Sequence, residues 1–162
     1  MKRTLISEFK NSINEKVNLQ GWIHKIRKLK NITFLIIRDR SGLVQCIVDN
    51  NKLDLSKVKI ESIVSIRGAV KESTNHLNPF EIQVENLEII NAALDELPIE
   101  INKENLEINL DTMLNNRILS LRHRKVNSIF KVQNSIVNGF REFLNKEGIY
   151  RNLYSKNCMG RS

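Results

Sequence analysis

The stretch that decides the fold is FLIIRDRSGLVQCIVD, residues 34–49. Two apolar runs rich in β-branched residues flank the segment 38–42, which predicts two strands joined by a tight turn in which Gly42 supplies unusual backbone angles. Phe34 at the start and Gln45 in mid-strand are unusual in a hairpin that serves only a core. These two side chains indicate that one face of the hairpin contacts something other than the core.

Five strands are predicted within the first 92 residues, after a short helix or irregular lead-in at 5–13. Alternating apolar and polar residues place these strands at 17–28, 32–39, 43–49, 62–71 and 80–90. Residues 50–61 are predicted to form a short helix or turn. This order is that of an OB-fold barrel, which commonly binds oligonucleotides on the face of its second and third strands. Another small β-barrel is the alternative.

The character of the sequence changes after residue 92. Residues 93–114 are acidic, contain Pro98 and predict a hinge or linker. The basic stretch NNRILSLRHRK, 115–125, leads into an amphipathic helix of roughly six turns, predicted at 124–146 and ended by Gly148. Its apolar residues recur at steps of three and four: Ile129, Val132, Ile136, Phe140 and Phe143. Residues 150–162 show no clear period and predict an atypical tail.

The chain is basic, with 26 Lys and Arg against 18 Asp and Glu, a net charge of +8 and a pI of about 9.7. That balance favours a polyanionic partner such as nucleic acid or an anionic membrane surface, the alternative being a basic domain without one. The apolar stretches are too short for a transmembrane span, and the N-terminus lacks the apolar middle of a secretory signal. Cys46 and Cys158 are isolated, which suits a reducing cytoplasm.

No catalytic or metal-binding motif is visible. His24, His76 and His123 are scattered and have no second ligand at a suitable spacing. There is neither a Gly-rich phosphate loop nor a nucleophile elbow. The sequence therefore predicts binding rather than unaided catalysis, with no metal.

Nucleic-acid binding fits the hairpin better. Single-stranded bases are held by aromatic stacking together with cationic contacts to their backbone. Phe34 lies close in sequence to several cations: Lys25, Arg27, Lys28 and Lys30. The alternatives are that Phe34 and Trp22 belong to the core, and that the cations line a solvated turn.

GWIHKIRKLKNITFLIIRDRSGLVQCIVD, residues 21–49, resembles the N-terminal anticodon-binding domain of aspartyl-tRNA synthetases. The shared pattern is a GW in the first strand, an Arg-rich turn and then F-x-x-x-R-D-R-x-G-x-V-Q. Residues 78–101 look like the fifth strand and hinge of that family. Residues 110–148, with LDT, NR and LR, resemble the start of the class II catalytic domain in archaeal-type enzymes. The similarity covers about residues 3–149.

The resemblance implies roles for individual residues. Phe34 is expected to stack on the middle anticodon base, a uracil, and Gln45 to hydrogen-bond to it. Arg27 and Glu81 are expected to contact the anticodon loop on the same face. Apart from the resemblance, the positive charge leads us to expect contacts to the phosphate backbone from five cations: Lys25, Lys28, Lys30, Arg67 and Lys71.

Intact members of this family are homodimers that use ATP and Mg to activate aspartate and transfer it to tRNA, and many archaeal-type enzymes also charge the asparagine tRNA. This chain departs from them, because no Pro follows Gly148 and the later motifs that hold ATP are missing. We therefore expect a truncated or frameshifted product that binds tRNA without cofactor and without aminoacylating it. The alternatives are a free-standing tRNA-binding or single-strand-binding OB-fold protein, an asparaginyl or lysyl synthetase-type module, or a remnant that only pairs through its helix.

Overall fold

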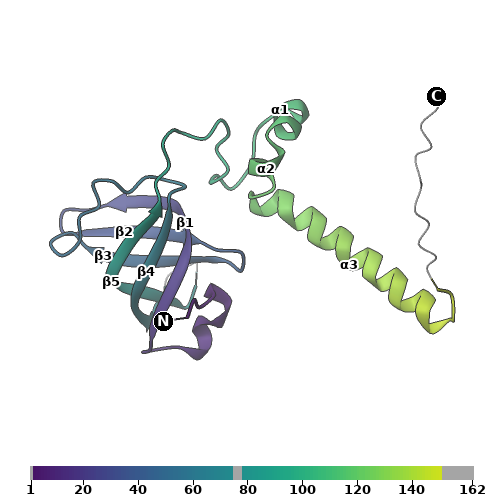
Figure 1. The fold of residues 1–162 in the computed structure, drawn as a ribbon, viewed down its shortest axis with the longest axis horizontal. Coiled ribbons are helices and arrows are strands. Elements are labelled where there is room, and N and C mark those ends of the chain that lie inside the picture. The colour runs from purple at the N-terminus through teal and green to yellow at the C-terminus, as the bar shows by residue number, and fades with distance from the viewer. Residues whose placement is uncertain (1, 75–77, 151–162) are drawn as a thin grey trace, which may run out of the picture. The chain divides into compact units, whose positions relative to one another are not determined.

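The computed structural model describes residues 2–74 and 78–150. It divides into two compact units, residues 1–97 and 98–162. The first unit holds the five strands, and the helices α1, α2 and α3 lie in the second (Figure 1). His76 and residues 151–162 of the predicted tail, including Cys158, lie outside the described residues.

The first unit is a closed five-stranded barrel, which confirms the predicted OB-fold. The strands follow one another around it in the order β1-β2-β3-β5-β4, and every neighbouring pair is antiparallel except β3 and β5 (Figure 1). Their bounds are Lys16–Lys28, Ile32–Arg38, Leu43–Asp49, Ile63–Glu72 and Phe80–Asn91 for β1 to β5.

The barrel core is filled by the inward-facing residues of each strand, as the alternation predicts. The 3-10 helix η1, Ile6–Asn11, adds Ile6 and Phe9, and the Phe9 ring meets that of Phe80 edge to face with centroids 5.8 Å apart. The fully buried strand residues are Leu19, Ile23, Leu35, Ile37, Val44, Cys46, Val48, Val64, Ile66, Val70 and Ile82.

Two glycines let neighbouring strands approach closely. A Cβ atom on Gly21 of β1 would clash with the backbone carbonyl of Arg38, and one on Gly68 of β4 would clash with that of Gln83. Backbone atoms cannot move aside as a side-chain end can, so larger residues at these positions would force the strands apart.

The turn between β2 and β3 is shaped by a carboxylate rather than by glycine. Asp39 Oδ1 accepts hydrogen bonds from the backbone N–H groups of Ser41 and Gly42 at 2.7 and 2.9 Å, and Oδ2 accepts one from that of Ile6 at 3.0 Å. Gly42 does not have a positive φ, so the expectation that it supplies unusual backbone angles is wrong. The physical reason is that the Asp39 side chain takes the place of a backbone acceptor in closing the turn.

Residues 50–61 form a series of turns and not the short helix that was one of the two alternatives. Asp54 Oδ1 accepts a hydrogen bond from the backbone N–H of Ser56 at 2.8 Å, and the N–H of Val58 donates to the carbonyl of Leu55. Aspartate and asparagine side chains in this segment compete with a helix for the backbone donors.

The second unit contains three helices: α1, Leu110–Asn115; α2, Arg117–Ser120; and α3, Arg124–Lys146. The bounds of α3 match the predicted 124–146, and Gly148 follows it with φ of 76°. The short helices α1 and α2 were not predicted. No residue of α3 is buried, and its apolar stripe lies in solvent.

Candidate nucleic-acid interface

Phe34 lies on the outer face of the barrel. Its neighbours on β2, Thr33 and Leu35, are buried inside, whereas the Phe34 ring points the other way and is half-buried. The alternative that Phe34 belongs to the core is therefore wrong. The ring is therefore partly exposed on the outer face, where a base can reach it, as stacking requires.

Strand register places the other predicted residues beside Phe34. Directly opposed residues on neighbouring strands share a face of the sheet. Arg27 on β1 lies opposite Phe34, which lies opposite Ile47 on β3. The neighbouring set of opposed outer residues, here called the outer row, crosses all five strands and consists of Lys25, Ile36, Gln45, Glu81 and Lys71.

Gln45 and Glu81 are joined by a hydrogen bond. Gln45 Nε2 donates to Glu81 Oε2 at 3.1 Å, and Ser73 Oγ donates to the same oxygen at 3.1 Å. Both side chains are half-buried. The contact occupies one donor of the Gln45 amide, so its second N–H and its carbonyl oxygen remain for a ligand.

Cations surround this face, but the register does not place them together. Lys25 is exposed at the β1 end of the outer row, and Lys71 at its other end donates to Asn14 Oδ1 at 3.1 Å. Arg67 is exposed on β4 opposite Asn18 and Asn86, on a row that holds none of the other predicted residues.

Lys28 and Lys30 lie at the turn that joins β1 to β2. Lys28 is opposite the buried Thr33, so the strand alternation turns it away from the face that Arg27 and Phe34 share. Lys30 is exposed in the turn itself. The predicted phosphate contacts thus fall into separate groups around the hairpin.

A buried charged cluster beside the hairpin was not predicted. Arg38 Nη2 lies 2.9 Å from each carboxylate oxygen of Glu61, its Nη1 lies 3.3 Å from His24 Nδ1, and its guanidinium lies 5.9 Å from the centre of the Trp22 ring. Glu61 has a backbone φ of 64°, a value that residues other than glycine rarely adopt. This cluster joins β1, β2 and the segment before β4, and it explains why Arg38 is almost fully buried.

Cys46 lies beneath the outer row and points into the core. Burial raises the pKa of its thiol far above the usual range, and the Glu81 carboxylate raises it further. The thiolate is the reactive form of cysteine, so Cys46 is a core residue without nucleophilic character.

The described ranges 2–74 and 78–150 contain no group of three or more His, Cys, Asp or Glu residues placed to hold a metal ion. Nor does any helix within them combine the length and apolar character needed to cross a membrane.

Comparison with known proteins agrees with this geometry. Residues 17–90 match the tRNA anti-codon family, described as an OB-fold nucleic acid binding domain. The Aspartate--tRNA(Asp/Asn) ligase of Thermus thermophilus is 37% identical over 145 residues, which are 90% of this chain and 33% of that protein. The Aspartate--tRNA(Asp) ligase of Thermoplasma volcanium is 36% identical over 138 residues, 83% of this chain and 32% of that protein.

A solved structure extends the similarity. The asparaginyl-tRNA synthetase from Pyrococcus horikoshii superposes with a TM-score of 0.83 at 30% identity, covering 95% of this chain and 36% of that one. The chain spans about a third of the length of the curated relatives it matches. Residues 17–90 therefore form a domain of the tRNA anti-codon family of OB-fold nucleic acid binding domains, and the chain as a whole is similar to about a third of the length of aspartyl- and asparaginyl-tRNA synthetases.

Proposed function

We propose that the chain binds the anticodon loop of the aspartate tRNA through the outer face of β1, β2, β3 and β5. The observation that carries this proposal is the arrangement of Phe34 on one face with Arg27 opposite it and the Gln45–Glu81 pair in the next row. The relatives are named as ligases of tRNA(Asp) or of tRNA(Asp/Asn), which supports the choice of tRNA.

Phe34 and Gln45 divide the recognition of one base between them. An aromatic ring stacks on any base, because every base has a π-face. An amide supplies both a donor and an acceptor, which is what the edge of an unpaired uracil requires. Gln45 retains both kinds of group after it has bound Glu81. The platform therefore supplies affinity, and the amide supplies the choice of the middle base.

The charge of the chain supports a polyanionic ligand. The net charge is +8, and exposed cations border the Phe34 face on β1 and in the turn that follows it: Lys25, Arg27 and Lys30. Contacts between such cations and phosphates give affinity without sequence preference and release counterions on binding.

The direct test is a titration of the full chain with three RNAs of equal length at one salt concentration. They are the anticodon stem-loop of the aspartate tRNA, the same stem-loop with the middle uracil replaced by cytosine, and an unstructured single strand. Tighter binding of the first RNA supports the proposal. Equal binding of all three would instead support a general single-strand-binding protein, and absence of binding would refute both.

The asparagine tRNA is the second candidate ligand, because the Thermus thermophilus relative is named for both tRNAs. The two anticodons share the middle uracil and differ only at the third base, because aspartate and asparagine codons differ only at their first base. We propose that the Phe34 and Gln45 contacts accept both tRNAs and that residues elsewhere on the barrel separate them. A stem-loop with the asparagine anticodon belongs in the same titration.

A further inference from the structure

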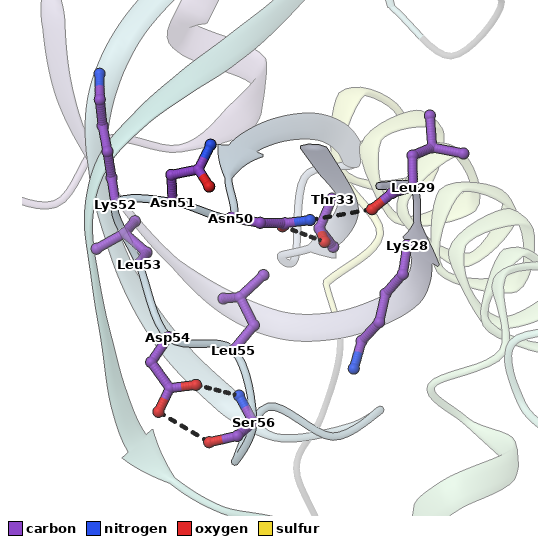
Figure 2. A pocket seen from close by; sticks show the side chains of 10 residues that line it. All are labelled: Lys28, Leu29, Thr33, Asn50, Asn51, Lys52, Leu53, Asp54, Leu55 and Ser56. Carbon is purple, nitrogen blue, oxygen red and sulfur yellow. Dashed lines mark hydrogen bonds between the residues drawn. The ribbon is translucent and has the colours of Figure 1, made fainter. Parts of the chain in front are cut away.

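A polar pocket of about 470 Å³ opens at the end of the barrel where the β1–β2 turn meets the loop after β3 (Figure 2). It is lined by Lys28 at the end of β1, by Leu29 in the turn that follows, by Thr33 from β2 and by residues 50–56. Its volume falls within the range of small-ligand sites, roughly 300–1,000 Å³. The two residues proposed to contact the base, Phe34 and Gln45, do not line this pocket.

Asn50 holds the pocket open in a fixed shape. Its Oδ1 accepts a hydrogen bond from Thr33 Oγ1 at 2.7 Å, and its Nδ2 donates to the carbonyl of Leu29 at 3.0 Å (Figure 2). Its backbone N–H donates to the carbonyl of Asn31 at 3.0 Å. The loop after β3 is thereby tied to the β1–β2 turn, so a ligand meets a preformed site and does not have to order it.

Three charged residues line the pocket, two cations and one carboxylate: Lys28, Lys52 and Asp54. Of the two cations, Lys52 is paired, with its Nζ 3.8 Å from Asp49 Oδ2. The Lys28 side chain lies at the edge of the group of lining residues in Figure 2, and Lys28 has no ion-pair partner within the described part of the chain. The Asp54 carboxylate is held by Ser56, whose backbone N–H and hydroxyl donate to it at 2.8 and 2.9 Å. These hydrogen bonds, first the backbone one, lower the pKa of Asp54. Lys28 is thus the group available to an anion, and Asp54 opposes one.

The pocket adjoins the proposed base platform. Arg27 is opposite Phe34 and Lys28 is opposite Thr33, so the pocket begins one residue further along both strands and on the other side of the sheet. A nucleic-acid strand that stacks one base on Phe34 and continues around the β1–β2 turn would therefore lead toward the pocket.

From this placement we propose that the pocket receives the phosphate and sugar of a nucleotide adjacent to the base stacked on Phe34, with the phosphate beside the Lys28 ammonium. The proposal rests on the proposed function, because the same strand occupies both places. It assigns Lys28 a site distinct from the outer face that holds Arg27. It also predicts that the Asp54 carboxylate repels the bound phosphate and so weakens RNA binding. A base in the pocket would not be expected to produce this repulsion, because a base carries no negative charge.

The first test uses the full chain and a fluorescently labelled aspartate anticodon stem-loop. Lys28→Gln should weaken binding about tenfold, as expected for a lost hydrogen bond to a charged group, and Asp54→Asn should tighten it. Asparagine keeps an acceptor oxygen for Ser56, so the turn is preserved. The charge-matched controls are Lys57→Gln in the same loop and Glu88→Gln on β5, which are exposed and line no part of the pocket. Thermal melts confirm that each variant is folded.

The second test locates the phosphate. Each of the two phosphates that flank the middle anticodon nucleotide is replaced in turn by an uncharged methylphosphonate. At one of the two positions, the methylphosphonate should weaken binding of the RNA to the wild-type chain. The same RNA should bind the Lys28→Gln variant no more weakly than the unmodified RNA does, because the contact is already lost. Losses that simply add at both positions, or a Lys28→Gln that behaves like Lys57→Gln, would overturn the pocket inference while leaving the proposed function intact if Phe34→Ala still weakens binding. A wild-type chain that does not bind the stem-loop overturns both.

Discussion

Gln45 Nε2 lies 3.1 Å from Glu81 Oε2, and the two residues face each other across the parallel pair of β3 and β5. Because the carboxylate accepts only, this contact fixes which end of the Gln45 amide points toward Glu81 and which end faces a ligand. Ser73 donates to the same oxygen and so holds the carboxylate in place. The geometry makes Glu81 the residue that orients Gln45.

Replacement of either residue of this pair should change base selectivity more than affinity. Gln45→Ala should remove the preference for uracil at the middle anticodon position, and Glu81→Ala should reduce it because the amide is no longer oriented. Dissociation constants for stem-loops with uracil and cytosine at that position measure the effect. Asn86→Ala, exposed further along β5 opposite Arg67 and outside the rows of Phe34 and Gln45, is the control. An unchanged preference in Gln45→Ala would refute the assigned role.

Loss of the Phe34 ring should affect binding and not folding. Phe34→Ala should weaken stem-loop binding by roughly 1–3 kcal/mol, the cost of one unstacked base, while Phe34→Trp should keep most of the affinity. Ile90→Ala, which removes an exposed apolar side chain from β5, is the matched control. Urea unfolding of the same variants separates the two explanations, because a core residue would lose stability and affinity together.

Binding should weaken steeply with salt. For single strands the slope of log K against log salt falls by about 0.7 for each phosphate contact removed. Arg27→Gln, Lys25→Gln and Lys30→Gln should each lower the slope by about that amount. Arg67→Gln should change the slope least, because the register places Arg67 opposite Asn18 and Asn86 and away from the outer row. A slope near zero in the wild-type chain would contradict an electrostatic contribution.

The buried pair of Arg38 and Glu61 should make a large contribution to stability. Removing one partner of a buried pair typically costs about 3–5 kcal/mol, because the other charge is left without compensation. Arg38→Met and Glu61→Gln should therefore each lower the free energy of unfolding, measured in urea. The double variant should lose less than the sum of the two, and strictly additive losses would show that the two charges do not depend on each other.

The exposed stripe of α3 should drive self-association. Phe140 and Phe143 are 66% and 61% exposed, and burying such a side chain is worth roughly 1.5–3 kcal/mol. We expect the full chain to associate with itself and a shortened chain ending at Asn91 to remain a folded monomer, since the barrel has its own core. Phe140→Glu with Phe143→Glu should abolish association in light scattering. A monomeric full chain would show that exposure of this stripe is tolerated.

The strands and α3 were predictable because their signals are local. Alternation along β4 and steps of three and four in α3 depend only on residues close in sequence, and the structure matches both. The resemblance of the hairpin pattern also placed Phe34 on the outer face, against the commoner fate of a strand phenylalanine.

The remaining features depend on contacts between segments far apart in the sequence. Arg38 in the turn pattern gives no local indication that it meets Glu61, 23 positions away. Asp39 likewise binds the backbone of Ile6, 33 positions away, so its role in the turn was assigned to Gly42 instead. The helices α1 and α2 are of six and four residues, too short to show a period.

The short parallel ladder between β3 and β5 has a dynamic consequence. Its register runs only from Gln45 opposite Glu81 to Ile47 opposite Gln83, whereas the other four pairings are longer. This seam is where the barrel should open first, and amide hydrogens there should exchange with solvent fastest among the strands. Gln45 and Glu81 sit on the seam, so an RNA bound across them would favour the closed barrel by mass action and slow that exchange. Hydrogen exchange should therefore report RNA binding: backbone amides of the β3–β5 pairing should exchange more slowly when the anticodon face is occupied.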